Sequence, residues 1–435
     1  MVKIAIIGAG SAIFSKDIIM DVLDFKELQG STFSLMDINA ERAELTKGLI
    51  EKFVKQENLS AKIEATTNRR EALKGADFVI LTIDTPGTEV IKYDVMIPYK
   101  YGIDVCIGDS MGAGGVFKGM RLIPIILDIC RDIEKLCPNA IVMNYVNPMA
   151  MVTWAINKYT SVKVVGLCHS VQKNSKALAQ WVGIPPEEID VWAAGINHMS
   201  WFLKLEWKGK SFYPKIWNKL HKPGVFEKQD KFRFEMMKSI GYYMTETSGH
   251  FSEYVPYFRK RKDIIKKLAG KRFEGESLFY YHYVGKMRKD CENFVRKQIK
   301  SKEKLPLEHS MEYAAEIVNA AVTNKTFRFN GNVENTGMVT NLPNGCCVEI
   351  PCFVDRLGIH PCYVGTLPPQ CAALNKSNIN VQEMAVQAVA SRKKEDVHQA
   401  VLLDPLTSAV LAPWEIRKMV DEMFKAEEKW LPKFK

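Results

Sequence analysis

Apolar positions along residues 2–168 follow two alternating patterns. Short β-branched runs, typical of strands buried on both faces, alternate with longer stretches in which apolar residues recur at helical spacing. The expected strands are Lys3–Ile7, Thr32–Met36, Phe78–Ile83, Ala140–Asn144 and Lys163–Leu167, and the clearest expected helices are Ile13–Leu23, Ala40–Phe53 and Lys118–Leu136. This alternation predicts an α/β fold with a doubly wound parallel sheet.

The second half of the chain has a different pattern. A strand is expected at Trp201–Trp207, followed by a Lys-rich, linker-like region and then by long helical patterns. Residues 326–367 are rich in Gly, Asn, Pro and β-branched residues and predict hairpins, while residues 378–430 return to helical spacing. We therefore expect a Rossmann-type N-terminal domain over residues 1–190 and a mixed α+β domain over residues 191–435.

The first expected strand ends in a glycine turn, Gly8-Ala9-Gly10, directly before a helix. The first glycine permits the tight turn, the second lets backbone amides approach a pyrophosphate, and the helix N-terminus favours the anion. Glycine turns also connect strands to helices without any ligand. Here, however, the second strand ends at Asp37, whose carboxylate can accept hydrogen bonds from the adenosine ribose hydroxyls and favours NAD over its 2′-phosphorylated form. The residues predicted to bind NAD are Gly8, Gly10, Ser11, Ala12, Ile13, Phe14 (in place of a third glycine), Asp37 and Thr82.

Four further segments place polar or ligand-type residues where an apolar stretch stops. They are Gly108–Gly115 (GDSMGAGG), Asn144–Pro148 (NYVNP), Gly166–Ser170 (GLCHS) and Ala194–His198 (AGINH). Strands of a doubly wound sheet present their ligands at their carboxyl ends, so residues just past those ends are candidates for a site. A turn residue or a core histidine explains any one segment, but the joint occurrence favours a common site.

These motifs resemble those of glycoside hydrolase family 4, the NAD- and divalent-metal-dependent glycosidases. The resemblance runs from the GAGS turn through D-x-x-GxGG, NPM, the Cys-His strand end and GINH to NLPNGCCVEIPCFVD-x-x-GIHP. Within the family the chain is most similar to the melibiase-type α-galactosidases, with GLCHSVQ at Gly166–Gln172 and AGINHMSW at Ala194–Trp201. Relatives that cleave phosphorylated sugars carry Asn where His169 stands here, which argues against a 6-phosphoglycoside substrate.

The resemblance also implies roles for individual residues. It implies a metal ion, usually manganese, bound by Cys168 and His198, and a thiolate with an imidazole suits a borderline divalent ion. It implies Asp109 as the acid that protonates the leaving oxygen and Tyr254, or else Glu246, as the base that removes a sugar proton. The implied sugar contacts are Asn147, Arg121 and His169, and His250 is a further candidate for the metal.

The activity that the resemblance implies is hydrolysis of α-galactosides. NAD oxidises C3 of the sugar, the base removes the C2 proton, elimination expels the glycosidic oxygen, water adds, and the hydride returns to the sugar. Family 4 is an exception to the two-carboxylate scheme of glycoside hydrolysis. Three alternatives stay open: an α-galacturonidase or α-glucuronidase of the same family, a malate- or lactate-type dehydrogenase, and an NAD-binding regulatory module.

Composition restricts the remaining possibilities. With 47% hydrophobic and 25% charged residues and no apolar run of membrane length, we expect a soluble cytoplasmic protein without a membrane partner. Ten cysteines without a CxxC pair predict reduced thiols. Residues 259–304 hold sixteen Lys and Arg against six Asp and Glu, which indicates a solvated helical face or a nearby anion. No nucleic-acid motif accompanies this stretch, so we expect a glycoside substrate, no nucleic acid, and, from the resemblance, a homodimer or homotetramer.

Overall fold

A single twelve-stranded sheet runs through the residues that the computed structural model describes, which are 1–225, 230–306 and 308–435. The strand order is β3-β2-β1-β4-β5-β6-β10-β11-β7-β8-β9, with β12 paired to β11. The first six strands are parallel and have the 3-2-1-4-5-6 order of dinucleotide-binding sheets. They are β1 (Lys3–Ile7), β2 (Thr32–Met36), β3 (Lys62–Thr66), β4 (Phe78–Leu81), β5 (Ile141–Asn144) and β6 (Lys163–Gly166).

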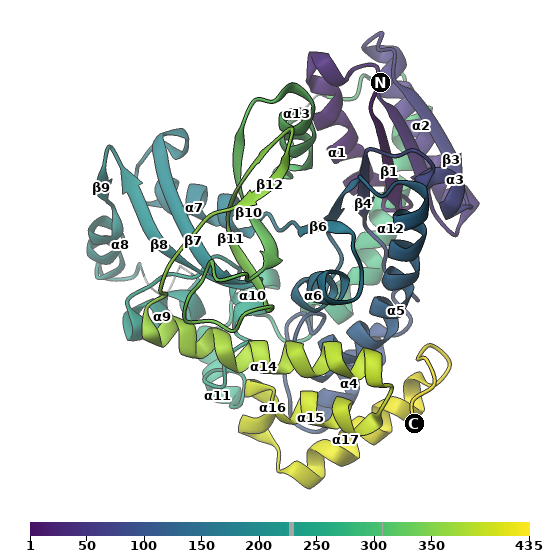
Figure 1. Cartoon of the computed structure of the whole chain (residues 1–435). Helices are drawn as coiled ribbons and strands as arrows, with labels where there is room; N and C mark the ends of the chain where they lie inside the picture. Colours follow the sequence, from purple (N-terminus) through teal and green to yellow (C-terminus); the bar gives the residue numbers. More distant parts are fainter. Residues whose placement is uncertain (226–229, 307) are drawn as a thin grey trace.

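The helices around the parallel strands pack in two groups (Figure 1). One group contains α1 (Ala12–Asp24), α2 (Ala40–Gln56), α12 (Phe279–Lys300) and α13 (Ala314–Thr323). The other contains α3 (Arg69–Leu73), α4 (Ile91–Lys100), α5 (Gly112–Leu136) and α6 (Met149–Tyr159). Because helices shield the sheet, Ile4, Ala5 and Ile6 of β1 are fully buried, which explains why the strand sequences are apolar without alternation.

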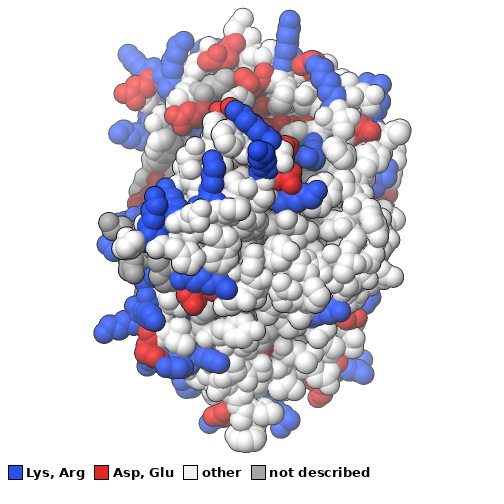
Figure 2. Space-filling model, turned by 90° about the vertical axis from the view of Figure 1, so that its left-hand side faces the viewer, with Lys and Arg blue, Asp and Glu red and all other residues white. Residues whose placement is uncertain are grey.

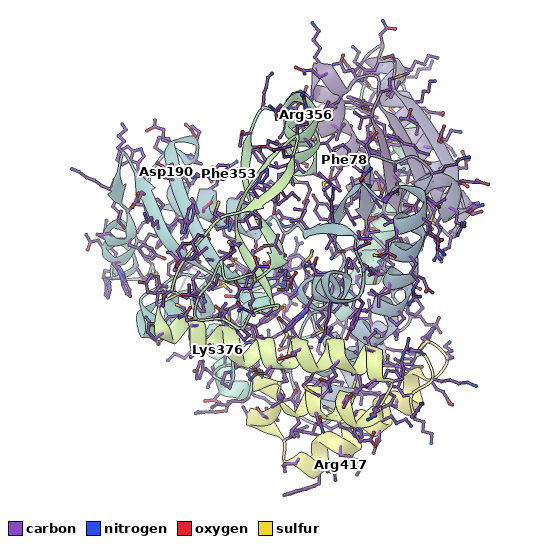
Figure 3. The ribbon with its side chains drawn as sticks, in the orientation of Figure 1. Phe78, Asp190, Phe353, Arg356, Lys376 and Arg417 are labelled. Atoms are coloured by element: carbon purple, nitrogen blue, oxygen red, sulfur yellow. The ribbon has the colours of Figure 1, made fainter. Side chains whose placement is uncertain are left out.

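Antiparallel strands continue the sheet beyond β6. They are β7 (Ile189–Ile196), β8 (Met199–Trp207), β9 (Lys210–Ser211), β10 (Phe327–Glu334), β11 (Cys347–Asp355) and β12 (Gly358–Pro361). Figure 3 places Phe78 of β4 in the parallel part and Phe353 of β11 in the antiparallel part. A single residue pair, Gly166 with Asn332, joins β6 to β10, and another, Gly195 with Glu349, joins β11 to β7. Both glycines are needed, because a Cβ on Gly166 would lie 2.9 Å from Cβ of Asn332 and one on Gly195 would lie 2.6 Å from a carbonyl oxygen.

The C-terminal helices return to the N-terminal half of the chain. They are α14 (Pro369–Ser391), α15 (Lys394–Leu402), α16 (Pro405–Val410) and α17 (Pro413–Glu427), drawn in yellow-green and yellow at the bottom of Figure 1. The first two pack against α5, and α17 packs against α4. The remaining helices, α7 (Ser170–Trp181), α8 (Tyr213–Leu220), α9 (Lys231–Ile240), α10 (Ser248–Phe251) and α11 (Lys262–Leu268), belong to the middle of the chain. One main core therefore includes residues from both halves.

The expected α/β fold is confirmed, with two corrections. The helix expected from Lys118 begins earlier, at Gly112, because the glycine-rich segment forms its first turn. The Lys-rich region after Trp207 is not a plain linker, since it contains β9 and α8, and Ile216 and Leu220 of α8 are buried. Residues 226–229 of that region lie outside the described residues. The apolar pattern does not predict β3, because this strand is partly exposed and lacks an apolar run.

Three further features concern the surface charges, the cysteines and the character of the helices. On the face drawn in Figure 2, Lys and Arg are interspersed with Asp and Glu around a broad uncharged area. All ten cysteines are free. Among the described helices, none combines the length and the apolar character that a membrane span requires.

Candidate active site

Three potential metal ligands meet where the parallel and antiparallel parts of the sheet join. They are Sγ of Cys168, a ring nitrogen of His198 and a carboxylate oxygen of Glu246, and the three atoms lie within 4.8 Å of one another. Oε2 of Glu246 is 3.5 Å from Nε2 of His198 and 3.7 Å from Sγ of Cys168. Thiolate, imidazole and carboxylate together suit a borderline divalent ion, so the group can hold the predicted metal with Glu246 as a third ligand.

The sheet junction brings the first two ligands together. Cys168 follows the end of β6, two residues after the bridging Gly166, and His198 follows the end of β7, three residues after the bridging Gly195. His198 lies in the two-residue turn between β7 and β8 and has a left-handed backbone with φ of 61°. A non-glycine residue rarely adopts this conformation, and such residues cluster at functional sites.

The charges of the three ligands depend on burial and on one another. Burial, together with the charge of the neighbouring His250, lowers the pKa of His198 to about 3, so its imidazole is neutral and has a lone pair for a metal. Burial and the carboxylates of Glu246 and Glu349 raise the pKa of Cys168. Burial opposes ionisation of Glu246, but His198 and His250 lower its pKa below the ordinary value. A bound dication would favour the thiolate of Cys168, because a coordinating thiol loses its proton.

His250 lies beside the donor group, whereas Glu246 belongs to it, so the structure favours Glu246 over His250 as the third metal contact. The ring of His250 stacks on the ring of His198, with centroids 3.9 Å apart. Its Nε2 is 3.3 Å from Oδ1 of Asp109, and its Nδ1 is 4.0 Å from Oε1 of Glu246. Although burial opposes the charge, these two carboxylates raise the pKa of His250 to about 10.

The carboxylate of Asp109 is surrounded by hydrogen-bond donors. Ser110 donates from 2.6 Å, Lys118 from 3.3 Å and Asn147 from 3.4 Å, in addition to the contact with His250. Burial opposes ionisation, but Lys118 and His250 hold the pKa of Asp109 well below its ordinary value. An ionised carboxylate has no proton to give. The role of Asp109 as the acid therefore stays a prediction that these contacts do not favour.

Tyr254 lies on the side of His198 away from Glu246. Its hydroxyl oxygen is 3.5 Å from Nδ1 of His198, and burial raises its pKa well above the ordinary value. With a metal on Nε2, the proton of His198 would lie on Nδ1, where the Tyr254 oxygen can accept it. Such a partner fixes the tautomer and the orientation of a metal-binding imidazole. Whether Tyr254 or Glu246 is the base stays a prediction.

The predicted NAD residues form a cradle at the ends of β1 and β2. Gly8 has φ of 98°, and its amide and that of Ala9 both donate to the Met36 carbonyl. The Gly10 amide donates to Asp37 Oδ2 over 2.9 Å, and a Cβ on Gly10 would lie 2.5 Å from that oxygen. The N-cap Ser11 makes no side-chain capping bond, so the first amides of α1 are left for another acceptor. This arrangement fits a pyrophosphate at a helix N-terminus.

The other predicted cofactor residues lie close by. Thr82 donates from Oγ1 to the Gly8 carbonyl over 3.0 Å and so joins β4 to the glycine turn. Ala12 and Ile13 form the first turn of α1. Phe14, the third residue of that turn, packs edge-on against Tyr145, with centroids 4.8 Å apart. The structure thus brings the predicted residues together, and their contacts with NAD stay predictions.

The three predicted sugar contacts lie in different environments. Asn147 is in the site, next to Asp109. His169 lies at its exposed rim, where Nδ1 is 2.9 Å from Glu312. Arg121 is only 3% exposed and forms ion pairs with Asp94 of α4 and Glu427 of α17. Arg121 therefore connects helices, and although it lines the same pocket as Asp109, its ion pairs do not favour a contact with the sugar.

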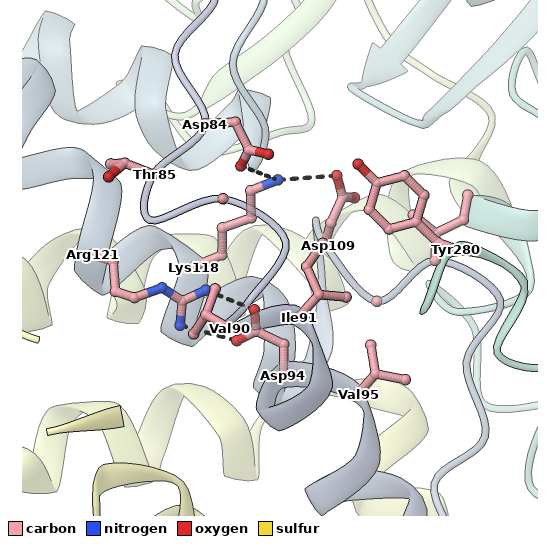
Figure 4. A pocket seen from close by; sticks show the side chains of 13 residues that line it. Asp84, Thr85, Val90, Ile91, Asp94, Val95, Asp109, Lys118, Arg121 and Tyr280 are labelled. Carbon is pink, nitrogen blue, oxygen red and sulfur yellow. Dashed lines mark hydrogen bonds and ion pairs between the residues drawn. The ribbon is translucent and has the colours of Figure 1, made fainter. Parts of the chain in front are cut away.

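The pocket next to Asp109 contains charged residues that the motifs do not predict (Figure 4). Nζ of Lys118 lies between Asp109, at 3.3 Å, and Asp84, at 3.7 Å. Arg288, from the basic stretch of α12, forms an ion pair with Asp84. A lysine on a helix is normally solvated, so the sequence does not indicate that Lys118 faces the site. Lys118 reaches Asp109 because α5 begins early, at Gly112.

A buried acid also lies near the metal group, close enough for its charge to act on Cys168 and Glu246. Glu349 of β11 is fully buried, and its carboxyl accepts a hydrogen bond from Asn332 over 3.4 Å. Burial raises its pKa to about 8, although hydrogen bonds from its neighbours oppose this. The motif NLPNGCCVEIPC contains Glu349, but its apolar surroundings do not distinguish it from a strand residue.

Known proteins resemble this chain over its whole length. The model of the "Family 4 glycosyl hydrolase" family matches residues 3–184, and that of the "Family 4 glycosyl hydrolase C-terminal domain" matches residues 193–407. An α-galactosidase from Bacillus subtilis is 41% identical, with 100% of each chain covered. An α-galactosidase from Rhizobium meliloti is 40% identical over 99% of this chain and 89% of its own. An α-galacturonidase from Lachnoclostridium phytofermentans is 29% identical over 99% of this chain and 97% of its own.

The fold agrees with these relationships. A structure of the 6-phospho-β-glucosidase from Thermotoga maritima with manganese, NAD+ and glucose-6-phosphate matches with a TM-score of 0.83, at 22% identity and with 100% of both chains covered. The parallel and antiparallel parts of the sheet thus belong to one known fold. The chain belongs to glycoside hydrolase family 4.

Proposed function

We propose that this enzyme hydrolyses α-galactosides with the help of NAD and of Mn²⁺ or another divalent metal ion. The observation that carries the proposal is the convergence of Cys168, His198 and Glu246 beside Asp109 and Asn147, at the carboxyl edge of a dinucleotide-type sheet. The 40–41% identity with α-galactosidases, against 29% with an α-galacturonidase, supports the galactoside.

The residues present fit both cofactors. Soft and hard donors in one buried group suit manganese or a similar ion, and few protein ligands leave positions for substrate oxygens. The uncapped α1 N-terminus and the Gly8 and Gly10 turn suit a pyrophosphate, and Asp37 suits a ribose. When bound, NAD would take up and return a hydride at the sugar, and the metal would polarise the adjacent oxygens and acidify the neighbouring carbon.

The protein's own groups then have distinct roles. We assign Tyr254 as the base at the sugar C2, because Glu246 faces the metal position. Burial raises the pKa of Tyr254, so this role requires the charge of a bound metal to stabilise the phenolate. His250, which carries the proton in its pair with Asp109, fixes that carboxylate. Asn147 and His169 are left to contact sugar hydroxyls. Burial of His198, Glu246 and Tyr254 excludes water around them, which strengthens their electrostatic interactions.

The charges in the pocket support a neutral sugar over a uronate. Among the described residues near Asp109, each cation already faces a carboxylate: Lys118 faces Asp84 and Asp109, and Arg288 faces Asp84. At the rim, His169 faces Glu312. A uronate carboxylate needs a cation whose charge is not already balanced by a protein carboxylate, to offset its desolvation. The excess charge of the basic stretch therefore does not supply a uronate site.

The test is an assay of p-nitrophenyl α-galactoside against the corresponding galacturonide, with NAD, Mn²⁺ and a thiol reductant. We expect turnover of the galactoside with NAD in catalytic amounts and no net growth of absorbance at 340 nm. Stoichiometric NADH would instead indicate a dehydrogenase, and NAD binding without turnover a regulatory module. Preference for the galacturonide would instead indicate an α-galacturonidase of the same family.

Three further expectations remain proposals. We propose that residues 1–190 hold NAD and that residues 191–435 contribute the sugar site and the oligomer contacts, with the metal group at their junction. We also propose that the enzyme works in the cytoplasm, which the ten free thiols support. A homodimer or homotetramer can be tested by light scattering.

A further inference from the structure

The turn that carries Asp109 has an unusual source of hydrogen bonds. Residues 103–111 precede α5 without regular secondary structure, yet Cys106 and Ile107 are buried. Buried backbone amides require partners. The carbonyls of Val105 and Cys106 accept from the amides of Leu278 and Tyr280, but three consecutive amides of this segment have no backbone acceptor.

One side chain satisfies all three amides. Oε1 of Glu253 accepts from the amides of Cys106, at 2.8 Å, and Ile107, at 2.7 Å, and Oε2 accepts from the amide of Gly108, at 3.0 Å. Glu253 is 2% exposed. Successive amides that converge on one anion form a rigid cradle, here filled by a carboxylate of the same chain. The next residue after this cradle is Asp109.

Glu253 also belongs to the segment that carries the other half of the site. It directly precedes Tyr254, and its amide donates to the carbonyl of His250 over 2.9 Å. The two segments pack closely, since a Cβ on Gly249 would lie 3.1 Å from Sγ of Cys106. The carboxylate of Glu253 thus ties the turn before Asp109 to the segment of His250 and Tyr254.

We propose that Glu253 is a positioning residue that sets the distance between Asp109 and the metal group through these three hydrogen bonds. It touches no reacting atom and acts through Asp109, His250 and Tyr254. This inference rests on the proposed function for its kinetic consequence, while the hydrogen bonds themselves can be tested separately. A displacement of about 1 Å in a catalytic group can lower a rate on the order of 100-fold.

The informative variant is Glu253→Gln. The glutamine keeps the shape and one oxygen for two amides, but its NH2 group would face the Gly108 amide, donor against donor. We expect kcat to fall by roughly 10- to 100-fold, while the dissociation constants for NAD and Mn²⁺ change by less than about twofold because their predicted residues are untouched. Retention of wild-type kcat by the folded variant would overturn the proposal.

Asp104→Asn is the matched control. Asp104 lies two residues before Cys106 and pairs with the buried Arg259, which also donates to Ser252 over 2.7 Å, so it belongs to the same buried network without contacting the turn amides. We expect this variant to lower the melting temperature and to keep kcat within about twofold. If both variants lose kcat in proportion to their loss of stability, Glu253 is only structural and the proposal is wrong.

Hydrogen exchange provides a test that does not depend on turnover or on a folded variant. In the wild-type protein the amides of Cys106, Ile107 and Gly108 should exchange as slowly as those of neighbouring helices, although they lie outside regular structure. Fast exchange of a peptide covering these residues would refute the hydrogen bonds. Slow exchange in a wild-type protein without glycosidase turnover would count against the proposed function and leave the role of Glu253 in holding the turn intact.

Discussion

The imidazole rings of His198 and His250 stack with centroids 3.9 Å apart and an angle of 25° between their planes. Two rings this close cannot both carry a charge at low cost. The charge lies on His250, which faces the carboxylates of Asp109 and Glu246, and His198 stays neutral. The stacking therefore separates the two histidines into a neutral imidazole, which suits a metal ligand, and a cation that organises carboxylates.

Cys168→Ser should abolish stoichiometric Mn²⁺ binding and turnover, because a hydroxyl rarely replaces a thiolate as a ligand for a borderline ion. NAD binding should survive, since the glycine turn lies elsewhere. The measurements are metal titration of metal-free protein and NAD titration. Cys130→Ser, which changes a buried thiol in the middle of α5, is the control and should keep the metal. Tight Mn²⁺ binding by the Cys168 variant would show that Cys168 is not a ligand of the metal.

Apolar runs locate Cys168 and His198 just past the ends of strand-like segments, and the family resemblance is what assigns them to a metal. The sequence does not predict that Glu246, and not His250, lies with Cys168 and His198 in the group that could hold a metal. Glu246 lies just before the short helix α10 and His250 lies within it, four positions later, and the packing of the His250 ring on His198 leaves Glu246 facing Nε2. For the same reason the sequence does not reveal Glu253, whose partners are backbone amides far away in the chain.

Charged residues on helices are the least predictable part of the site. Lys118 and Arg121 lie one turn apart on α5, yet Lys118 faces Asp109 and Arg121 faces Asp94 and Glu427. The difference depends on where the helix starts and on α17, which packs against α4 from the other end of the chain. No local pattern contains that information.

Asp37→Ala should weaken NAD binding by about 1–3 kcal/mol, the range expected for charge-assisted hydrogen bonds to the ribose. It should also reduce the preference for NAD over its 2′-phosphorylated form, because the repulsion between a carboxylate and the phosphate disappears. Both dissociation constants can be measured by calorimetry. An unchanged constant for NAD would mean that the end of β2 does not hold the ribose.

Arg121→Met should lower the free energy of unfolding by about 3–5 kcal/mol, because it leaves the buried Asp94 and Glu427 without their partner. The KM for substrate should not change in the folded protein. Denaturant unfolding and steady-state kinetics separate these effects, and adding Glu427→Gln should recover part of the stability. A raised KM with unchanged stability would restore Arg121 as a sugar contact.

Asp404→Asn should stabilise the enzyme above pH 6 and have no effect below about pH 4. Asp404 caps α16 and is 1% exposed, and burial raises its pKa to about 6. The folded state therefore binds a proton more tightly than the unfolded state, so stability falls as the pH rises from about 4 to 6. Asparagine caps equally well and carries no charge, so we expect a gain of about 3 kcal/mol at pH 7. Unfolding curves across this range, with the exposed Asp128→Asn as control, check the pH dependence.

Asp84→Asn should shift specificity toward uronides. In the wild type the Asp84 carboxylate engages both Lys118 and Arg288 at one side of the pocket, so neither cation is free for an anionic sugar. Without that charge, Arg288 loses this ion pair. Lys118 loses its ion pair with Asp84 and keeps the one with Asp109. We expect the ratio of kcat/KM for the galacturonide to that for the galactoside to rise about tenfold, the effect of one charge-assisted hydrogen bond.

The control is Asp263→Asn, which removes a charge from the basic stretch that contains Arg288. Asp263 forms an exposed ion pair with Arg261, so this variant should leave the ratio unchanged. An unchanged ratio in the Asp84 variant would mean that Lys118 and Arg288 lie beyond the reach of the sugar, and substrate choice would then have to come from the groups around Asn147 and His169.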